Sequence, residues 1–137
     1  MNRTEQFAFR LDFQSGVPVY RQLIDQVLGG IASGTLAPGN QLPTVRQVAV
    51  DLAINPNTVL RAYRELEIRG VLETHQGTGT FIAPQRVERD EVERRRQLEQ
   101  LAGDCAARAG QAGFTVRQLI AALGDTAGES SRENTRP

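Results

Sequence analysis

Two helix starts lie so close together in this sequence that the helices they begin must be joined by a tight turn. Thr44 and Gln47 match a capping box, in which each side chain satisfies a backbone N–H group of the other residue. Asn55 is a favoured N-cap residue, and Pro56 follows it at the first helical position, where a missing N–H group costs nothing. The apolar face that starts at Val45 is short, so only about two or three residues separate the helices, which is helix-turn-helix spacing.

The second helix of this pair is followed directly by a change from helical to strand periodicity. Gly70 is predicted to end the helix, whose inward face consists of Val59, Ala62, Tyr63 and Leu66. Residues 71–74 and 80–82 are predicted to form two strands, and the glycine-containing loop between them suits a β-hairpin. Two helices in close succession and a hairpin after them predict a winged helix-turn-helix.

Another helix is predicted before this unit. Pro18 suits a first helical turn, and Gly34 can adopt the left-handed conformation that ends a helix. The apolar residues between them follow helical spacing and give one buried face, made of Tyr20, Leu23, Ile24, Val27, Leu28 and Ile31. Further upstream, an alternating pattern predicts a short strand or an extended arm on the core, formed by Phe7, Phe9, Leu11 and Phe13.

The chain after Ala83-Pro84 is highly charged and then carries a narrow apolar stripe, which indicates a helix that packs against a partner helix. Thr115 and Gln118 form another capping box, and the helix that it opens is predicted to end at Gly124. Cys105 is interpreted as a packing residue rather than a redox switch. These patterns predict a dimer interface made of Leu98, Leu101, Cys105, Leu119, Ile120 and Leu123.

Together these elements predict a mainly α-helical fold with a small β-hairpin. Residues 1–83 are expected to form the winged helix-turn-helix DNA-binding domain with its N-terminal arm. Residues 84–124 are expected to form the helical dimerisation region. Residues 125–137 are small and polar, which predicts a disordered tail.

The charge balance limits how the chain could bind nucleic acid. The 16 basic side chains are matched by 16 acidic ones, so the net charge is zero. A DNA-binding surface must therefore be positive only locally, because contacts with phosphates supply most of the affinity. The single cysteine and the lack of a signal-peptide pattern suggest a cytoplasmic protein, and no stretch approaches the roughly 18 apolar residues of a membrane span.

No group of residues indicates catalysis or a bound cofactor. The sequence contains no nucleophile with a recognisable base, no phosphate-binding Walker loop and no dinucleotide-binding fingerprint. One histidine and one cysteine cannot assemble a conventional zinc cluster. We therefore expect no enzyme activity, no cofactor and no metal.

The second helix of the pair carries the side chains best suited to read DNA. Asn57, Arg61 and Arg64 lie opposite the apolar face, and such residues can pair bidentately with adenine and guanine. Arg46 lies in the first turn of the preceding helix, where the helix dipole disfavours a cation, so a contact with phosphate or a base would explain it. The alternative interpretation is an ordinary solvated polar face.

The start of this helix and the hairpin offer further contacts with DNA. Asn55 and Thr58 could cap the helix, touch phosphate or read a base. Gly77 would let the hairpin backbone approach a groove closely, and Thr78 could donate a hydrogen bond. His75 could contact phosphate. The alternative is that the glycine only makes the turn.

Five motifs in this order resemble the GntR family of bacterial regulators over residues 17–83, namely Leu42–Arg46, Asn55–Val59, Ala62–Leu66, Gly70–Thr74 and Gly77–Phe81. The sequence of residues 55–59 and the short tail are similar to the YtrA-like subfamily, whose short helical C-terminal part serves dimerisation. The resemblance implies that the residues in contact with DNA include Arg46, Asn57, Thr58, Arg61 and Gly77. His75 and Thr78 stand where basic residues are frequent in the family, so this wing is less basic.

The expected function is a homodimeric, sequence-specific DNA-binding regulator that represses rather than activates transcription. A two-fold dimer predicts an inverted-repeat operator in double-stranded DNA. The resemblance implies repression of the chain's own operon, often one that encodes a transporter. A small-molecule effector could bind between subunits, but the sequence identifies none. The alternative function, favoured by the zero net charge, is a winged-helix adaptor that binds another protein without specific DNA binding.

Overall fold

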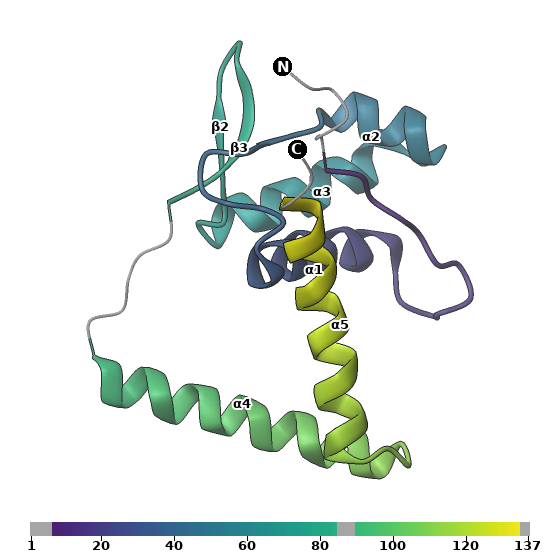
Figure 1. Ribbon diagram of the computed structural model, residues 1–137. Helices are drawn as coiled ribbons and strands as arrows, with labels where there is room; N and C mark the ends of the chain where they lie inside the picture. Colours follow the sequence, from purple (N-terminus) through teal and green to yellow (C-terminus); the bar gives the residue numbers. More distant parts are fainter. Residues whose placement is uncertain (1–6, 85–89, 135–137) are drawn as a thin grey trace. The chain divides into compact units, whose positions relative to one another are not determined.

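The computed structural model describes residues 7–84 and 90–134 and divides the chain into two compact units, residues 1–85 and 86–137. Unit 1 contains α1 (Val19–Ser33), β1 (Gln41–Leu42), α2 (Val45–Leu52), α3 (Pro56–Ile68), β2 (Leu72–His75) and β3 (Gly79–Ile82). Unit 2 contains α4 (Glu91–Gln111) and α5 (Val116–Asn134) (Figure 1). The mainly helical fold with a winged helix-turn-helix is confirmed.

The helix-turn-helix forms where the capping residues predicted it. The Thr44 hydroxyl accepts a hydrogen bond from the Gln47 N–H group at 3.1 Å, and Asn55 Oδ1 accepts one from the Asn57 N–H group at 2.8 Å. Both caps satisfy backbone donors that the first turn of a helix leaves unpaired. Ala53 ends α2 with a φ of 54°, a left-handed conformation that turns the chain sharply between the helices.

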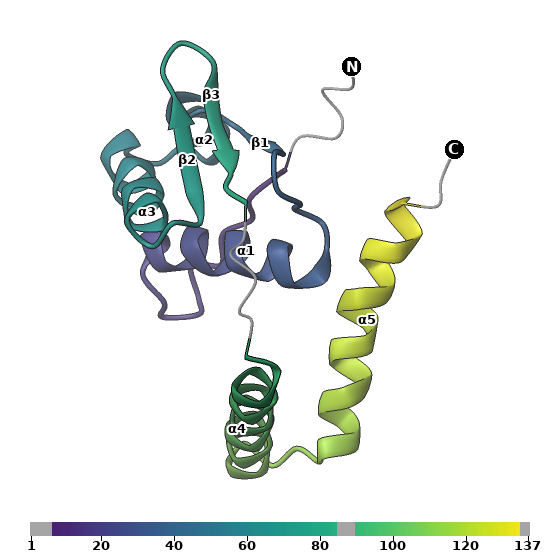
Figure 2. The ribbon, with the colours of Figure 1, turned by 90° about the vertical axis from the view of Figure 1, so that its left-hand side faces the viewer.

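The wing belongs to a three-stranded antiparallel sheet in the order β1-β3-β2. β2 pairs with β3 as the predicted hairpin, whose tip projects beyond the helices (Figure 2). β1, which the sequence did not predict, pairs Gln41 with Phe81 and Leu42 with Thr80. A strand of two residues has no periodicity of its own, so only its partner strand defines it.

The core of unit 1 lies where α1 and α3 pack together under the sheet. Leu23, Val27, Val59 and Leu66 are fully buried there, as their helical spacing predicted. The hydroxyl of Tyr63 donates a hydrogen bond of 2.6 Å to the carbonyl oxygen of Pro43 inside this core. Burial raises the pKa of the Tyr63 hydroxyl well above its ordinary value, so the hydroxyl stays protonated and remains a donor.

The N-terminal arm lies extended along α1. Glutamine side chains of α1 make the hydrogen bonds with its backbone that a neighbouring strand would otherwise make. Gln26 Oε1 accepts the Arg10 N–H group at 2.9 Å. Gln22 Oε1 accepts the Asp12 N–H group, and its Nε2 donates to the Asp12 carbonyl oxygen, both at 2.9 Å. Phe9 is buried, but Phe13 is 75% exposed because the chain turns after Asp12, so a core position for Phe13 was wrong.

Unit 2 consists of two helices joined by a capped turn. Thr115 Oγ1 accepts the Gln118 N–H group at 3.1 Å, and Gln118 Oε1 accepts the Thr115 N–H group at 2.9 Å, which confirms the capping box. α5 was predicted to end at Gly124 but continues to Asn134, because a glycine inside a helix costs only about 1 kcal/mol. Residues 125–134 are therefore helical where disorder was predicted, and residues 135–137 lie outside the described residues.

No helix in the described part of the chain combines the length and the apolar character that crossing a bilayer requires.

Replacing Tyr63 by phenylalanine removes a donor and leaves the buried Pro43 carbonyl oxygen without a partner. Loss of a partner for a buried acceptor costs about 1–3 kcal/mol, so we expect the free energy of unfolding to fall by that amount in urea titrations of the full chain. The matched control is Tyr20→Phe, because the Tyr20 hydroxyl makes no hydrogen bond within the described residues. Equal losses in the two variants would contradict the role of this hydrogen bond.

Candidate nucleic-acid interface

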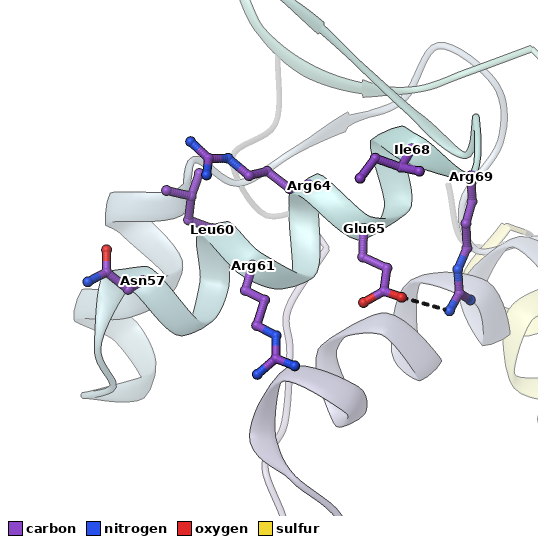
Figure 3. A pocket seen from close by; sticks show the side chains of 7 residues that line it. All are labelled: Asn57, Leu60, Arg61, Arg64, Glu65, Ile68 and Arg69. Atoms are coloured by element: carbon purple, nitrogen blue, oxygen red, sulfur yellow. Dashed lines mark hydrogen bonds and ion pairs between the residues drawn. The ribbon is translucent and has the colours of Figure 1, made fainter.

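The outward face of α3 carries the three polar side chains that the sequence placed there. Asn57, Arg61 and Arg64 are exposed, while Val59 and Tyr63 point into the core. The three exposed side chains lie along one open hollow of about 560 Å³ on the helix surface (Figure 3). The other residues that line this hollow are Leu60, Glu65, Ile68 and Arg69.

In the first turn of α3, some residues cap the helix and others are free to contact a ligand. Asn55 uses its side-chain oxygen to cap the helix, which is one of the roles predicted for it. Thr58 is half-buried, and its N–H group donates to the Asn55 carbonyl oxygen at 3.0 Å. The exposed Asn57 side chain lies at a helix N-terminus, where the helix dipole favours an anion such as phosphate.

The exposed side chains of α3 diverge to two sides of the helix. Arg61 and Glu65 point to one side, and Leu60, Arg64 and Ile68 point to the other (Figure 3). On its side, the guanidinium carbon of Arg61 lies over the ring of Tyr20 in α1, 3.9 Å from the ring centroid. The sequence had assigned Tyr20 only to the buried face of α1, and a contact between helices leaves no local signal that would have revealed this one.

The arginines of the helix-turn-helix differ in whether an acid neutralises them. Arg69 at the end of α3 forms an ion pair of 3.2 Å with Glu65. Arg46, exposed in the first turn of α2, and Arg61 and Arg64 on α3 form no ion pair with any carboxylate of the described residues. These three cations therefore supply a local positive charge, which a chain of zero net charge needs in order to attract phosphates.

The wing contributes the remaining predicted residues, which do not line the hollow on α3. Gly77 at its tip has a φ of 80°, and the Thr78 N–H group donates to the His75 carbonyl oxygen at 2.9 Å. Gln41 of β1, which the sequence analysis missed, donates from Nε2 to the Thr78 carbonyl oxygen at 3.1 Å. This bond fixes the hairpin tip to the rest of the sheet.

His75 is the wing residue whose surroundings fit DNA least well. Its Nε2 lies 3.3 Å from Glu73 Oε1, and its ring makes an edge contact with Phe81. A phosphate would have to compete with this carboxylate for the imidazole and would be repelled by it. The structure therefore leaves His75 exposed but gives it an acidic neighbour.

The residues predicted for the dimer interface all lie in unit 2. Leu98 and Leu101 on α4 are 66% and 59% exposed, and Ile120 and Leu123 on α5 are 63% and 59% exposed. Cys105 and Leu119 are half-buried. α4 and α5 meet at the turn that joins them and diverge from it (Figures 1 and 2), so they leave most of this apolar surface uncovered within the described residues.

Comparison with known proteins finds a family model within unit 1 and relatives that match half of the chain or more. The family model described as bacterial regulatory proteins, gntR family, matches residues 19–82. The HTH-type transcriptional regulator YhcF of Bacillus subtilis is 42% identical over 91 residues, which are 66% of this chain and 75% of the relative. The HTH-type transcriptional repressor YtrA of the same species is 43% identical over 74 residues, which are 54% of this chain and 57% of the relative.

A solved structure with DNA also resembles this fold. The DNA-binding domain of AraR, in complex with operator ORX1, is 25% identical and superposes with a TM-score of 0.50. The match covers 57% of this chain and 100% of that domain.

Alanine substitutions at two glycines of the wing show how backbone conformation and a close contact each affect the stability of the fold. Gly77 and Gly79 have φ values of 80° and 137°, but only a Cβ at Gly79 would collide with another atom, Gln41 Nε2. We expect Gly77→Ala to lower the free energy of unfolding by about 1 kcal/mol. Gly79→Ala should lower it by about 2–3 kcal/mol in the same urea titration, because a φ of 137° is more strained for alanine than the left-handed region and Gln41 must also leave Thr78.

The control for this prediction is the pair of substitutions in a Gln41→Ala background. Without the Gln41 amide the collision is gone, so the loss caused by Gly79→Ala should be smaller than in the wild-type background, while the strain of the backbone conformation remains. A loss of the same size with and without Gln41 would show that the collision has no part in it.

Proposed function

The chain belongs to the GntR family of bacterial regulatory proteins, and we propose that it represses transcription as a homodimer bound to an inverted-repeat operator in double-stranded DNA. Unit 1 would supply the contacts with DNA, and unit 2 would supply the contact between subunits. The two parts of the proposal rest on separate observations and have separate tests.

The observation that carries the DNA-binding part is the set of unpaired cations on the helix-turn-helix. Arg46, Arg61 and Arg64 are exposed, and no described carboxylate neutralises them. Phosphate contacts supply most of the affinity of a protein for DNA, and such contacts need cations that are free to make them. An adaptor that binds another protein would have no comparable need for this concentration of unpaired arginines.

The shape of α3 suits a recognition helix in the major groove. Asn57 lies in its first turn, and Arg61 and Arg64 follow on the exposed face, so the helix could present amide and guanidinium groups to base edges. Gly77 and Thr78 at the tip of the wing would contact the backbone or a neighbouring groove. The similarity of unit 1 to the AraR domain bound to its operator supports this mode of binding.

The homodimer is proposed from the apolar surface of unit 2. Leu98, Leu101, Ile120 and Leu123 are all more than half exposed, although an apolar stripe on a helix is stable only when another helix covers it. A second copy of unit 2 offers a matching stripe. Repression is supported by the similarity to YtrA, a transcriptional repressor.

The DNA-binding part is tested by selecting binding sites from a random duplex library with the full chain. We expect an enriched inverted repeat, and on a duplex that carries it Arg61→Ala should weaken binding about 5- to 150-fold, the value of one bidentate contact with a base. Fluorescence anisotropy titrations at several salt concentrations measure the affinity.

The control variant is Arg96→Ala, which removes the same charge from an exposed position on the side of α4 away from the apolar stripe and should leave the affinity unchanged. Wild-type binding should also weaken steeply as salt rises, because counterions are released from the phosphates. If no sequence is enriched and binding does not respond to salt, the adaptor function replaces the one proposed.

The dimer is tested by placing a charge in the apolar stripe of α4. Leu101→Asp should convert the dimer to a monomer in sedimentation velocity, because association would bury an unpaired carboxylate. The control is Ala107→Asp, at an exposed position on the opposite side of α4, which should remain a dimer. A dimeric Leu101→Asp variant would remove α4 from the proposed interface.

A further inference from the structure

We propose that Tyr20 is a positioning residue for DNA recognition, which holds the guanidinium group of Arg61 over its ring and so orients Arg61 before DNA binds. The inference rests on the proposed function, because it concerns how Arg61 reaches DNA. It starts from the contact of 3.9 Å between the guanidinium carbon of Arg61 and the centroid of the Tyr20 ring. Tyr20 lies in the first turn of α1, which packs against α3.

The contact restrains Arg61 without using its hydrogen-bond donors. A cation is attracted to the face of an aromatic ring, whereas the N–H groups of a guanidinium lie at its edges. The guanidinium of Arg61 donates no hydrogen bond to any described residue, so its N–H groups remain available for a base or a phosphate. An arginine side chain that is already restrained loses less conformational entropy when it binds.

The neighbouring charges do not compete with the ring for Arg61. Glu65 lies one helical turn after Arg61 and points to the same side of α3 (Figure 3). Its carboxylate is held by Arg69 at 3.2 Å. The acid on α1, Asp25, is paired with Arg21 at 3.5 Å. An aromatic ring therefore orients Arg61, and the cation keeps its full charge for DNA.

A direct contact of Tyr20 with DNA is the competing explanation, and the phenol hydroxyl distinguishes the two. The hydroxyl makes no hydrogen bond within the described residues, so it takes no part in orienting Arg61. Phenylalanine keeps the ring face and loses only the hydroxyl. Positioning through the ring therefore predicts that Tyr20→Phe binds DNA like the wild type, whereas a direct phosphate contact predicts that it does not.

The experiment is a double-mutant cycle in the full chain, with the duplex recovered by selection as the probe. Tyr20→Leu should weaken binding about 2- to 5-fold, the effect of losing a solvent-accessible cation–π contact, and Tyr20→Phe should not. In an Arg61→Ala background, Tyr20→Leu should have no further effect, because its only consequence acts through Arg61. A loss of equal size in both backgrounds, or a loss in Tyr20→Phe, would overturn the inference.

Two further measurements separate this inference from folding and from the proposed function. Urea titrations check that Tyr20→Leu is as stable as the wild type, and nuclear magnetic resonance of the free chain reports the ring directly. The side-chain protons of Arg61 should show an upfield ring-current shift in the wild type and in Tyr20→Phe, and not in Tyr20→Leu. If the wild type shows the shift but enriches no DNA sequence, the proposed function fails. If the wild type enriches a DNA sequence but its Arg61 protons show no ring-current shift, the positioning role fails.

Discussion

The buried hydrogen bond from the Tyr63 hydroxyl to the Pro43 carbonyl oxygen ties α3, the proposed recognition helix, to the segment that organises the rest of unit 1. Each residue of that segment, residues 41–44, makes a different contact. Gln41 holds the tip of the wing, and Leu42 pairs with β3 and is buried in the core. Thr44 caps α2. Because one short stretch of chain contacts α2, α3 and the wing, the three elements keep a common geometry, which binding to DNA requires of them.

A chain of zero net charge can bind a polyanion if its acids are engaged and its cations are not. Glu65 and Glu73 lie near the residues proposed to contact DNA, and both already have partners, Arg69 and His75. Arg61 is restrained by a tyrosine ring and not by a carboxylate, so it is ordered and still fully charged. The distribution of partners, more than the number of charges, gives α3 its positive surface, and that field extends only about a Debye length, roughly 8 Å, at physiological salt.

Patterns among residues close together in the sequence predicted most of the fold. The caps at Thr44 and Asn55 marked the starts of α2 and α3, and helical spacing identified the buried faces. β1 was missed because its two residues are a strand only by virtue of pairing with β3. The end of α5 was wrong because a glycine such as Gly124 weakens a helix by about 1 kcal/mol, which does not terminate it.

By itself, the sequence determined the helix-turn-helix, the wing and the set of side chains that point out of α3, because capping and periodicity are properties of residues close together in the chain. Only the tertiary structure decided what those side chains meet. The ring of Tyr20 lies under Arg61, and the amide of Gln41 lies against the tip of the wing, because helices and strands from distant parts of the chain pack together. Such contacts depend on the packing geometry of the elements, and no pattern within one element records it.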